Sequence, residues 1–374
     1  MTLRLDTAFA ELALRNGGDG EALAIFQQVL AADPPADPAT RRRARCGQAW
    51  ALEKLGRREE AIPHYRELLA DPATAVGSAE WALLAVALCR SYRDVGDQAM
   101  SVDFGERALR ELAAADVPPL DEHLQLGSTL MSCYVMRGDL TSAKLLADQL
   151  MPLARETGSR VALGAVEWNS SLIAREQGRY EEALELAERA LALMAEADNA
   201  RHQGMLRTNL AVVMVARGRP AVAAELLRTA FGILRESARL CEVLDVVCLL
   251  GEVLVQLGDP VEALEWAEQG RELLDGASDD LWRERAAVAL VHGRAQLLAG
   301  AAELGESELR RCRLLLGRAG DQDRSVAAIW RRLGDSWVEL GRQDEAMTAY
   351  QEALALLGLP VAARLVPGRR RALS

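Results

Sequence analysis

The sequence predicts an all-α protein, a solenoid of about nine helical hairpins that fills its 374 residues. A glycine recurs every 39 to 42 residues, and the fifth residue after each glycine is Ala, Ser or Gly. Between these positions the apolar residues follow helical spacing, and no segment alternates like a strand. Because a fixed period of about 20 to 50 residues is the signature of a repeat array, we expect one continuous fold.

Two positions define each repeat. A glycine can adopt the left-handed conformation that ends a helix, and a small residue lets the next helix cross close to it. The glycines are Gly17, Gly56, Gly96, Gly138, Gly178, Gly218, Gly258, Gly300 and Gly341, and the small residues are Ala22, Ala61, Ser101, Ala143, Ala183, Ala223, Ala263, Gly305 and Ala346. In five units a glutamate precedes the small residue, where negative charge favours the start of a helix by about 0.3 to 1 kcal/mol. We therefore interpret these carboxylates as helix-start residues rather than as catalytic pairs.

Helix breakers separate the units. They are DPPADP at 33–38, DVPP at 116–119, ETGS at 156–159, EADN at 196–199, GASDD at 276–280 and GRAGD at 317–321. We expect residues 1–358 to form a single solenoid, and residues 359–374 to form a weak cap and a flexible basic tail.

The composition excludes several classes of protein. The chain has 55 acidic and 44 basic residues, and a net charge of -11 argues against binding to nucleic acid or to an anionic membrane. The basic runs at 41–45 and 369–371 contain no aromatic residues that could stack on bases. No window of 18 apolar residues could span a bilayer, and Asp6 and Glu11 interrupt any secretory segment. We expect a cytoplasmic protein.

The sequence offers no support for catalysis, a metal or a cofactor. The six cysteines form no CxxC pair, and the four histidines lie in different units without ligand spacing. Phosphate-binding and dinucleotide-binding glycine motifs, HExxH and GxSxG are all missing. We expect a protein that is not an enzyme and holds neither metal nor cofactor.

The last unit shows a resemblance to a known family. Trp330, Leu333, Gly334, Trp337, Gly341, Ala346, Tyr350 and Ala353 stand at the signature spacings of the tetratricopeptide repeat. The period is about 40 residues rather than the 34 of the standard repeat, and in this it resembles the extended repeats of peptide-sensing bacterial regulators and cell-polarity adaptors. The resemblance implies a right-handed superhelix whose first helices line a concave groove roughly 90 Å long.

The register of the repeat then selects polar residues for the groove. Nine residues before the glycine, a position that faces inward in this family, stand Thr129, Asn169 and Asn209, preceded by Ser128, Trp168 and Thr208. An asparagine amide both donates and accepts, so it can pair with the backbone of a ligand peptide whatever its side chains are. Similar asparagines hold peptides in the extended-repeat proteins. The alternative is that each asparagine only bonds to a neighbouring helix.

Charged residues also fall on this face. Arg90, Ser132, Glu252 and Arg294 stand six residues before a glycine, and Arg93 and Arg175 lie one helical turn nearer the turn. We predict that Arg90 and Arg93 could bind ligand carboxylates and that Asp245 with Glu252 could bind a basic residue. The alternative is a solvated inner face.

Together these patterns favour a non-enzymatic module that binds a peptide or a protein segment in its groove, with a regulatory role as a sensor or adaptor. A structural scaffold that oligomerises through the ends of the solenoid is the alternative, because solenoid ends need polar caps. The sequence does not identify the ligand.

Overall fold

The computed structural model describes residues 2–115, 121–236, 239–319 and 326–359. These residues form eighteen α-helices and one short 3₁₀ helix, without a strand. The predicted all-α solenoid of helical hairpins is confirmed. The DVPP breaker and the basic tail at 369–371 lie outside the described residues, as does part of GRAGD.

Each hairpin pairs an odd-numbered first helix with an even-numbered second helix. The first helices are α1 (Thr2–Arg15), α3 (Pro38–Lys54), α5 (Ala79–Asp94), α7 (Asp121–Arg137), α9 (Arg160–Glu176), α11 (Ala200–Ala216), α13 (Leu240–Leu257), α15 (Trp282–Leu298) and α17 (Ala327–Glu339). The second helices are α2 (Asp19–Ala31), α4 (Arg58–Ala70), α6 (Gln98–Ala114), α8 (Leu140–Glu156), α10 (Tyr180–Glu196), α12 (Pro220–Leu234), α14 (Pro260–Leu274), α16 (Ala302–Leu316) and α18 (Gln343–Leu356). The 3₁₀ helix η1 (Asp279–Leu281) precedes α15.

The two repeat-defining positions have the roles that the sequence assigns to them. All nine turn glycines have φ between +69° and +89°, the left-handed region that glycine adopts without strain. The nine small residues that follow are buried at the crossing of the two helices. The five glutamates before them lie in the first turns of α2, α4, α10, α14 and α18.

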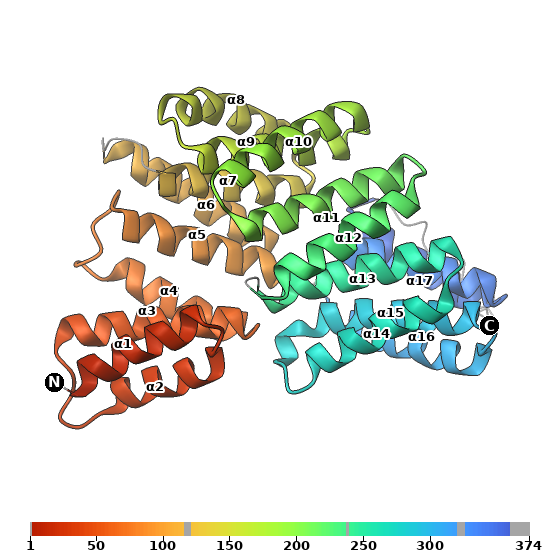
Figure 1. Cartoon of the computed structure of the whole chain (residues 1–374), viewed down its shortest axis with the longest axis horizontal. Coiled ribbons are helices and arrows are strands. Elements are labelled where there is room, and N and C mark those ends of the chain that lie inside the picture. The colour runs from red at the N-terminus through yellow and green to blue at the C-terminus, as the bar shows by residue number, and fades with distance from the viewer. Residues whose placement is uncertain (1, 116–120, 237–238, 320–325, 360–374) are drawn as a thin grey trace, which may run out of the picture.

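The hairpins stack into an arch (Figure 1). It rises from α1 and α2 through α5 and α7 to α8 and α10, and descends through α11 and α13 to α14 and α16. The ends of α3 and α5 then come close to the start of α13 and of α15, so the arch closes on itself. The long groove expected from the sequence is curled in this structure, so that its two halves meet at one edge while the inner face stays partly open to solvent.

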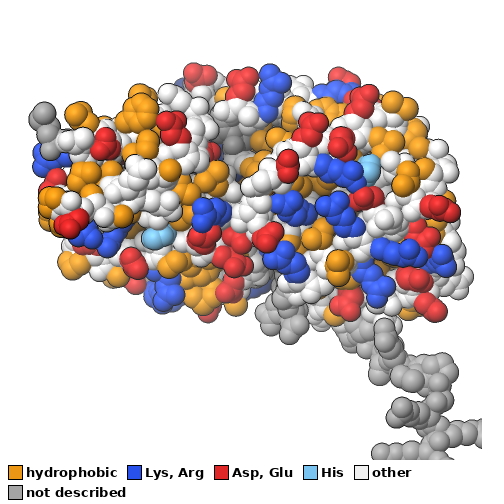
Figure 2. All heavy atoms as spheres, turned by 90° about the horizontal axis from the view of Figure 1, so that it is seen from below, with side chains coloured by type: hydrophobic (Ala, Val, Ile, Leu, Met, Phe, Trp, Pro, Cys, Tyr) orange, Lys and Arg blue, Asp and Glu red, His pale blue; other side chains and the backbone are white. Residues whose placement is uncertain are grey.

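Ion pairs among Glu53, Arg58, Asp94, Arg239 and Glu284 hold the closure, and Arg283 adds a hydrogen bond to the Asp94 backbone carbonyl. We call these six residues the clasp. Arg239 lies 3.1 Å from Glu53 and 2.8 Å from Asp94. Arg58 binds Glu284, 226 residues away, at 2.9 Å, with only 3% of the arginine side chain exposed. Figure 2 shows acidic and basic side chains gathered in the middle of the lower face, between the two halves of the arch.

An apolar contact accompanies these ion pairs. The fully buried Leu281 of η1 packs on Gly56, where an added Cβ would lie 2.8 Å from a Leu281 methyl carbon. The backbone N–H of Glu59 also donates to Asp280 at 3.3 Å. The closure is therefore stabilised both by apolar packing and by ion pairs.

Within the described residues no helix is long and apolar enough to cross a membrane. No cluster of metal-ligating side chains is present there either.

Candidate ligand chamber

The inner face of the arch carries three adjoining hollows, which together we call the chamber. One, of about 210 Å³, lies among α5, α7, α9 and α11; the second, of about 380 Å³, lies among α9, α11, α13, α15 and α17; the third, of about 240 Å³, lies against the clasp. Met205 lines all three, and Trp168 and Leu172 line the first two. The hollows therefore share parts of their walls.

Eleven of the thirteen residues singled out from the sequence line the chamber. They are Arg90, Arg93, Ser128, Thr129, Ser132, Trp168 and Asn169 in the first hollow and Arg175, Thr208, Asn209 and Asp245 in the second. Glu252 and Arg294 line none of the three hollows and form an ion pair with each other. The register of the repeat thus predicts most of these residues to be in the chamber wall. The role of each side chain in binding stays a prediction.

The two asparagines differ in how much of their amide is free. Asn209 donates from Nδ2 to Ser171 at 2.9 Å and accepts from Arg175 at its Oδ1 at 2.7 Å. Asn169 donates to the Ala165 carbonyl of its own helix at 2.9 Å, and its Oδ1 has no hydrogen-bond partner among the described residues. In this conformation the Asn169 Oδ1 is wholly free to accept from a ligand, whereas the Asn209 Oδ1 already accepts one hydrogen bond.

The arginines at the clasp side of the first hollow are already paired. Arg90 lies 2.7 Å from Glu53, and Arg93 lies 2.8 Å from Asp94 and donates to Ser132 at 3.1 Å. Burial raises the pKa of Asp94, but Arg93, Arg239 and Arg58 outweigh it and hold that pKa below its ordinary value. A ligand carboxylate would therefore have to compete with a fixed internal one.

Three polar atoms of the first hollow have no hydrogen-bond partner within the described protein: Ser128 Oγ, Trp168 Nε1 and His202 Nδ1. Trp168 and His202 pack edge to face, with ring centroids 5.8 Å apart. Burial lowers the pKa of His202 to about 4, so this ring is neutral at pH 7. The hollow therefore offers donors and acceptors without a net charge from these three groups.

Asp245 behaves differently from the other carboxylates. Its side chain faces the chamber and forms no ion pair among the described residues, although protein surrounds it closely. The side chain is exposed within the chamber, but the dense protein around it limits its hydration, and this effect together with the nearby Glu284 raises the pKa of Asp245 to about 7. Arg332, which also lines the second hollow, likewise has no ion-pair partner in the part of the chain that is described.

Sequence reasoning missed His202, Met205 and Arg239, which line the chamber. The first two lie on α11 at register positions that the sequence analysis did not use. Arg239 lies just before α13, outside the repeat pattern. One signal for the closure was present: Arg58 is the only basic residue two positions after a turn glycine in the nine units.

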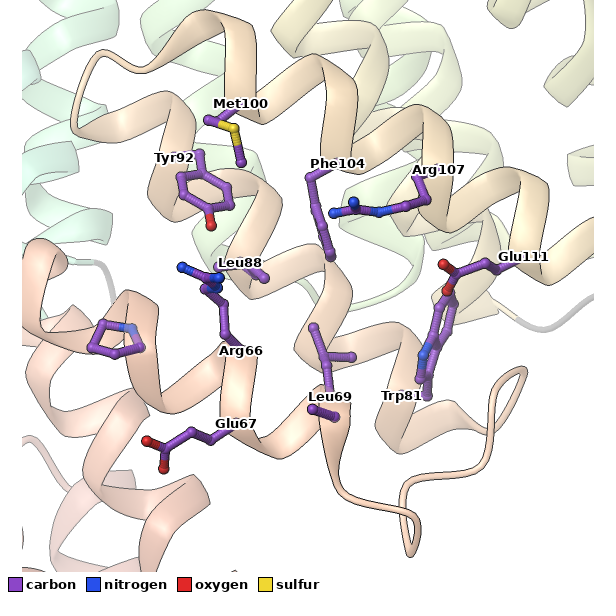
Figure 3. Close-up of a pocket in the computed structure, with 12 residues that line it drawn as sticks. Arg66, Glu67, Leu69, Trp81, Leu88, Tyr92, Met100, Phe104, Arg107 and Glu111 are labelled. Carbon is purple, nitrogen blue, oxygen red and sulfur yellow. The ribbon is translucent and has the colours of Figure 1, made fainter.

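A larger hollow of about 660 Å³ lies outside the chamber, between α4, α5 and α6. Figure 3 shows its aromatic side chains, Trp81, Tyr92 and Phe104, with Arg66 and Arg107 beside them. None of its lining side chains has a buried polar atom without a partner. Since unpaired buried atoms are what a ligand would satisfy, the chamber is a better candidate site than this hollow.

Sequence models of known protein families match three segments of the chain. Models described as tetratricopeptide repeat match residues 47–80, 163–236 and 246–269. The chain contains tetratricopeptide repeats. No curated protein sequence matches it.

Solved structures resemble this tetratricopeptide-repeat chain over most of its length. A Rap protein complexed with competence and sporulation factor is 14% identical with a TM-score of 0.62, and the match covers 95% of this chain and 97% of that one. Aspartyl phosphate phosphatase F from Bacillus subtilis is 13% identical with a TM-score of 0.56, covering 96% of both chains. NprR in complex with its cognate peptide NprX is 14% identical with a TM-score of 0.50, covering 70% of this chain and 76% of that one. At these identities the likenesses show the fold alone.

Proposed function

We propose that this protein is a non-enzymatic regulatory module that binds a peptide, or an extended segment of a partner protein, in its chamber. The observation that carries the proposal is the set of unpaired atoms on Ser128, Trp168 and His202 in one hollow. A buried polar atom without a partner costs about 1 to 3 kcal/mol, which a ligand that supplies the missing hydrogen bonds would recover.

The chemistry of the lining fits a peptide. A peptide backbone alternates donors and acceptors, as do the Trp168 N–H, the Ser128 hydroxyl and the free Asn169 Oδ1. Apolar side chains of the ligand could pack on Leu172, Met205 and the other apolar residues of the second hollow. Two of the solved structures with a similar fold are described as complexes with a factor or a cognate peptide, which supports the proposal by analogy.

Filling the chamber tests this proposal. Ala287 lines the second and third hollows and is only partly buried, so Ala287→Trp adds bulk there without deleting a contact. Ala302→Trp, on the exposed start of α16 in the same unit, is the matched control. Each purified protein would be incubated with a peptide fraction of the native cytoplasm, washed, and its retained peptides identified by mass spectrometry.

We expect wild type and Ala302→Trp to retain the same peptide and Ala287→Trp to lose it at least tenfold. Equal retention by all three proteins would place binding elsewhere. We choose a cytoplasmic extract because the sequence predicts a cytoplasmic protein.

One observation favours the alternative, a scaffold that associates through its ends. Leu5, Phe9 and Leu12 lie on one face of α1 and are 54 to 62% exposed. Such an apolar stripe at the first helix of a solenoid could pack on a second copy. Sedimentation at tens of micromolar tests it: a concentration-dependent dimer that Phe9→Ser abolishes supports the scaffold, and a strict monomer removes it.

A further inference from the structure

Two cysteines from neighbouring units meet in the core behind the chamber wall. Cys89 of α5 and Cys133 of α7 have their sulfur atoms 3.7 Å apart, and neither side chain is exposed. All six cysteines of the protein are free thiols in this structure. This is the one sulfur–sulfur contact among them at hydrogen-bond distance within the described residues.

The surroundings make the two thiols unequal. The hydrogen bond between the two thiols lowers the pKa of Cys133 despite burial, with help from Arg93, while the same bond and burial raise the pKa of Cys89. Cys89 also lies 3.2 Å from the Ser101 carbonyl. Cys133 is therefore the better nucleophile, since the thiolate is the reactive form.

The contact is close enough to become a covalent bond. A disulfide has its sulfur atoms about 2.05 Å apart, so the two atoms need to approach by less than 2 Å. Cys89 and Cys133 are the sequence neighbours of Arg90 and Ser132, which line the first hollow. Both thiols are fully buried, so a small oxidant reaches them through local opening of the interface between the stacked units.

We propose that Cys89 and Cys133 form a site of reversible oxidation, at which a small peroxide converts the two thiols into a disulfide that joins α5 to α7. The Cys133 sulfur attacks one peroxide oxygen, the O–O bond breaks, and hydroxide leaves with the Cys133 proton as water. The Cys89 sulfur then attacks the resulting sulfenic acid; the S–S bond forms, the S–O bond breaks, and a second water leaves with the Cys89 proton. Two thiols and one hydrogen peroxide give one disulfide and two waters.

The crosslink would act on the chamber through its wall. Arg93 of α5 donates to Ser132 of α7, the neighbour of Cys133, so a bond between the two helices fixes the spacing of chamber residues from both units. The inference does not depend on the identity of any ligand.

The test uses the full protein and hydrogen peroxide, followed by alkylation of free thiols in denaturant and tryptic mass spectrometry without reduction. The sequence places Cys89 in the tryptic peptide 67–90 and Cys133 in the peptide 111–137. We expect the number of free thiols to fall from six to four, a linked species of these two peptides lighter by two hydrogens, and full recovery on adding a thiol reductant.

Cys133→Ala is the matched variant, and it should give no crosslink to peptide 67–90 under the same treatment. The proposal is overturned if all six thiols of the wild type stay alkylatable, or if oxidation falls instead on Cys248, which faces the chamber, with no linked 67–90 and 111–137 species. Because the wild-type measurement alone decides this, a poorly folded variant leaves the conclusion intact.

Discussion

Asn209 shows what the register of a repeat predicts about a residue and what it does not. Its position nine residues before a turn glycine predicts the inner face, and it does line the chamber. Its hydrogen bonds, however, go to Arg175 and Ser171 of the preceding unit. A long side chain such as Arg175 can reach many partners, and the choice depends on the packing of two units, which a one-dimensional spacing does not contain.

The first prediction concerns Asp245, because its pKa of about 7 in the folded protein lies above the usual value for Asp. The folded protein then binds more protons than the unfolded chain between about pH 4 and pH 7, so this residue lowers stability as the pH rises through that window. Asp245→Asn removes the effect. We expect the variant to gain stability over wild type on going from pH 4.5 to pH 7.5, on the order of 1 kcal/mol because the carboxyl still faces the chamber solvent.

The measurement is urea unfolding of both proteins at the two pH values. Taking the difference between variant and wild type cancels the opposite contribution of the clasp carboxylates. An equal difference at both pH values would show that Asp245 is ionised throughout.

At the scale of the helical element, local rules account for nearly all of the fold. The hairpin needs a left-handed residue at the turn and a small residue at the crossing, and both are visible in the sequence. Gly218 (φ +71°) and Ala223 meet these needs between α11 and α12. Helix positions were therefore predictable from spacing, whereas the bending of the stack into a closed arch depends on small rotations at each interface.

A pair of glycines in one unit tests the turn argument. An added Cβ would meet no atom within 4 Å at Gly218 or at Gly232, but only Gly218 has a positive φ; Gly232 lies inside α12. We expect Gly218→Ala to destabilise the protein by about 1 to 2 kcal/mol and Gly232→Ala to stabilise it by up to about 1 kcal/mol. Chemical denaturation monitored by circular dichroism checks the signs; a shift of the same sign in both variants would contradict the role of the turn conformation.

At the scale of the whole molecule, the clasp joins the two halves of the arch. Arg239 and Arg58 each pair with carboxylates that lie far away in the sequence. Asp94 is 145 residues from Arg239, and Glu284 is 226 residues from Arg58. Burial raises the pKa of Glu53, but Arg90 and Arg239 outweigh it and lower that pKa overall, so the clasp is intact above the usual carboxyl range and weakens as the pH falls through the lowered value. No periodic pattern predicts such contacts, because they join units that are distant in the array.

Two adjacent arginines test the clasp. Arg58 is buried against Glu284, whereas Arg57 pairs with Glu60 while 35% and 54% of their side chains stay exposed. We expect Arg58→Met to cost about 3 to 5 kcal/mol, because it leaves a buried carboxylate unpaired, and Arg57→Met to cost less than about 1 kcal/mol. Equilibrium urea unfolding measures both, and small-angle scattering should show a larger radius for Arg58→Met alone. Equal losses in the two variants would contradict the special contribution of the buried Arg58–Glu284 pair.

A photo-cross-linker tests the proposed binding of a peptide in the chamber. Benzoylphenylalanine would replace Val212, which lines the second hollow, or Val222, a 38% exposed residue of α12 in the same unit. After irradiation in native extract, we expect a discrete peptide adduct on the protein labelled at position 212 and none on the protein labelled at position 222. No adduct at 212, or the same adducts at both positions, would contradict it.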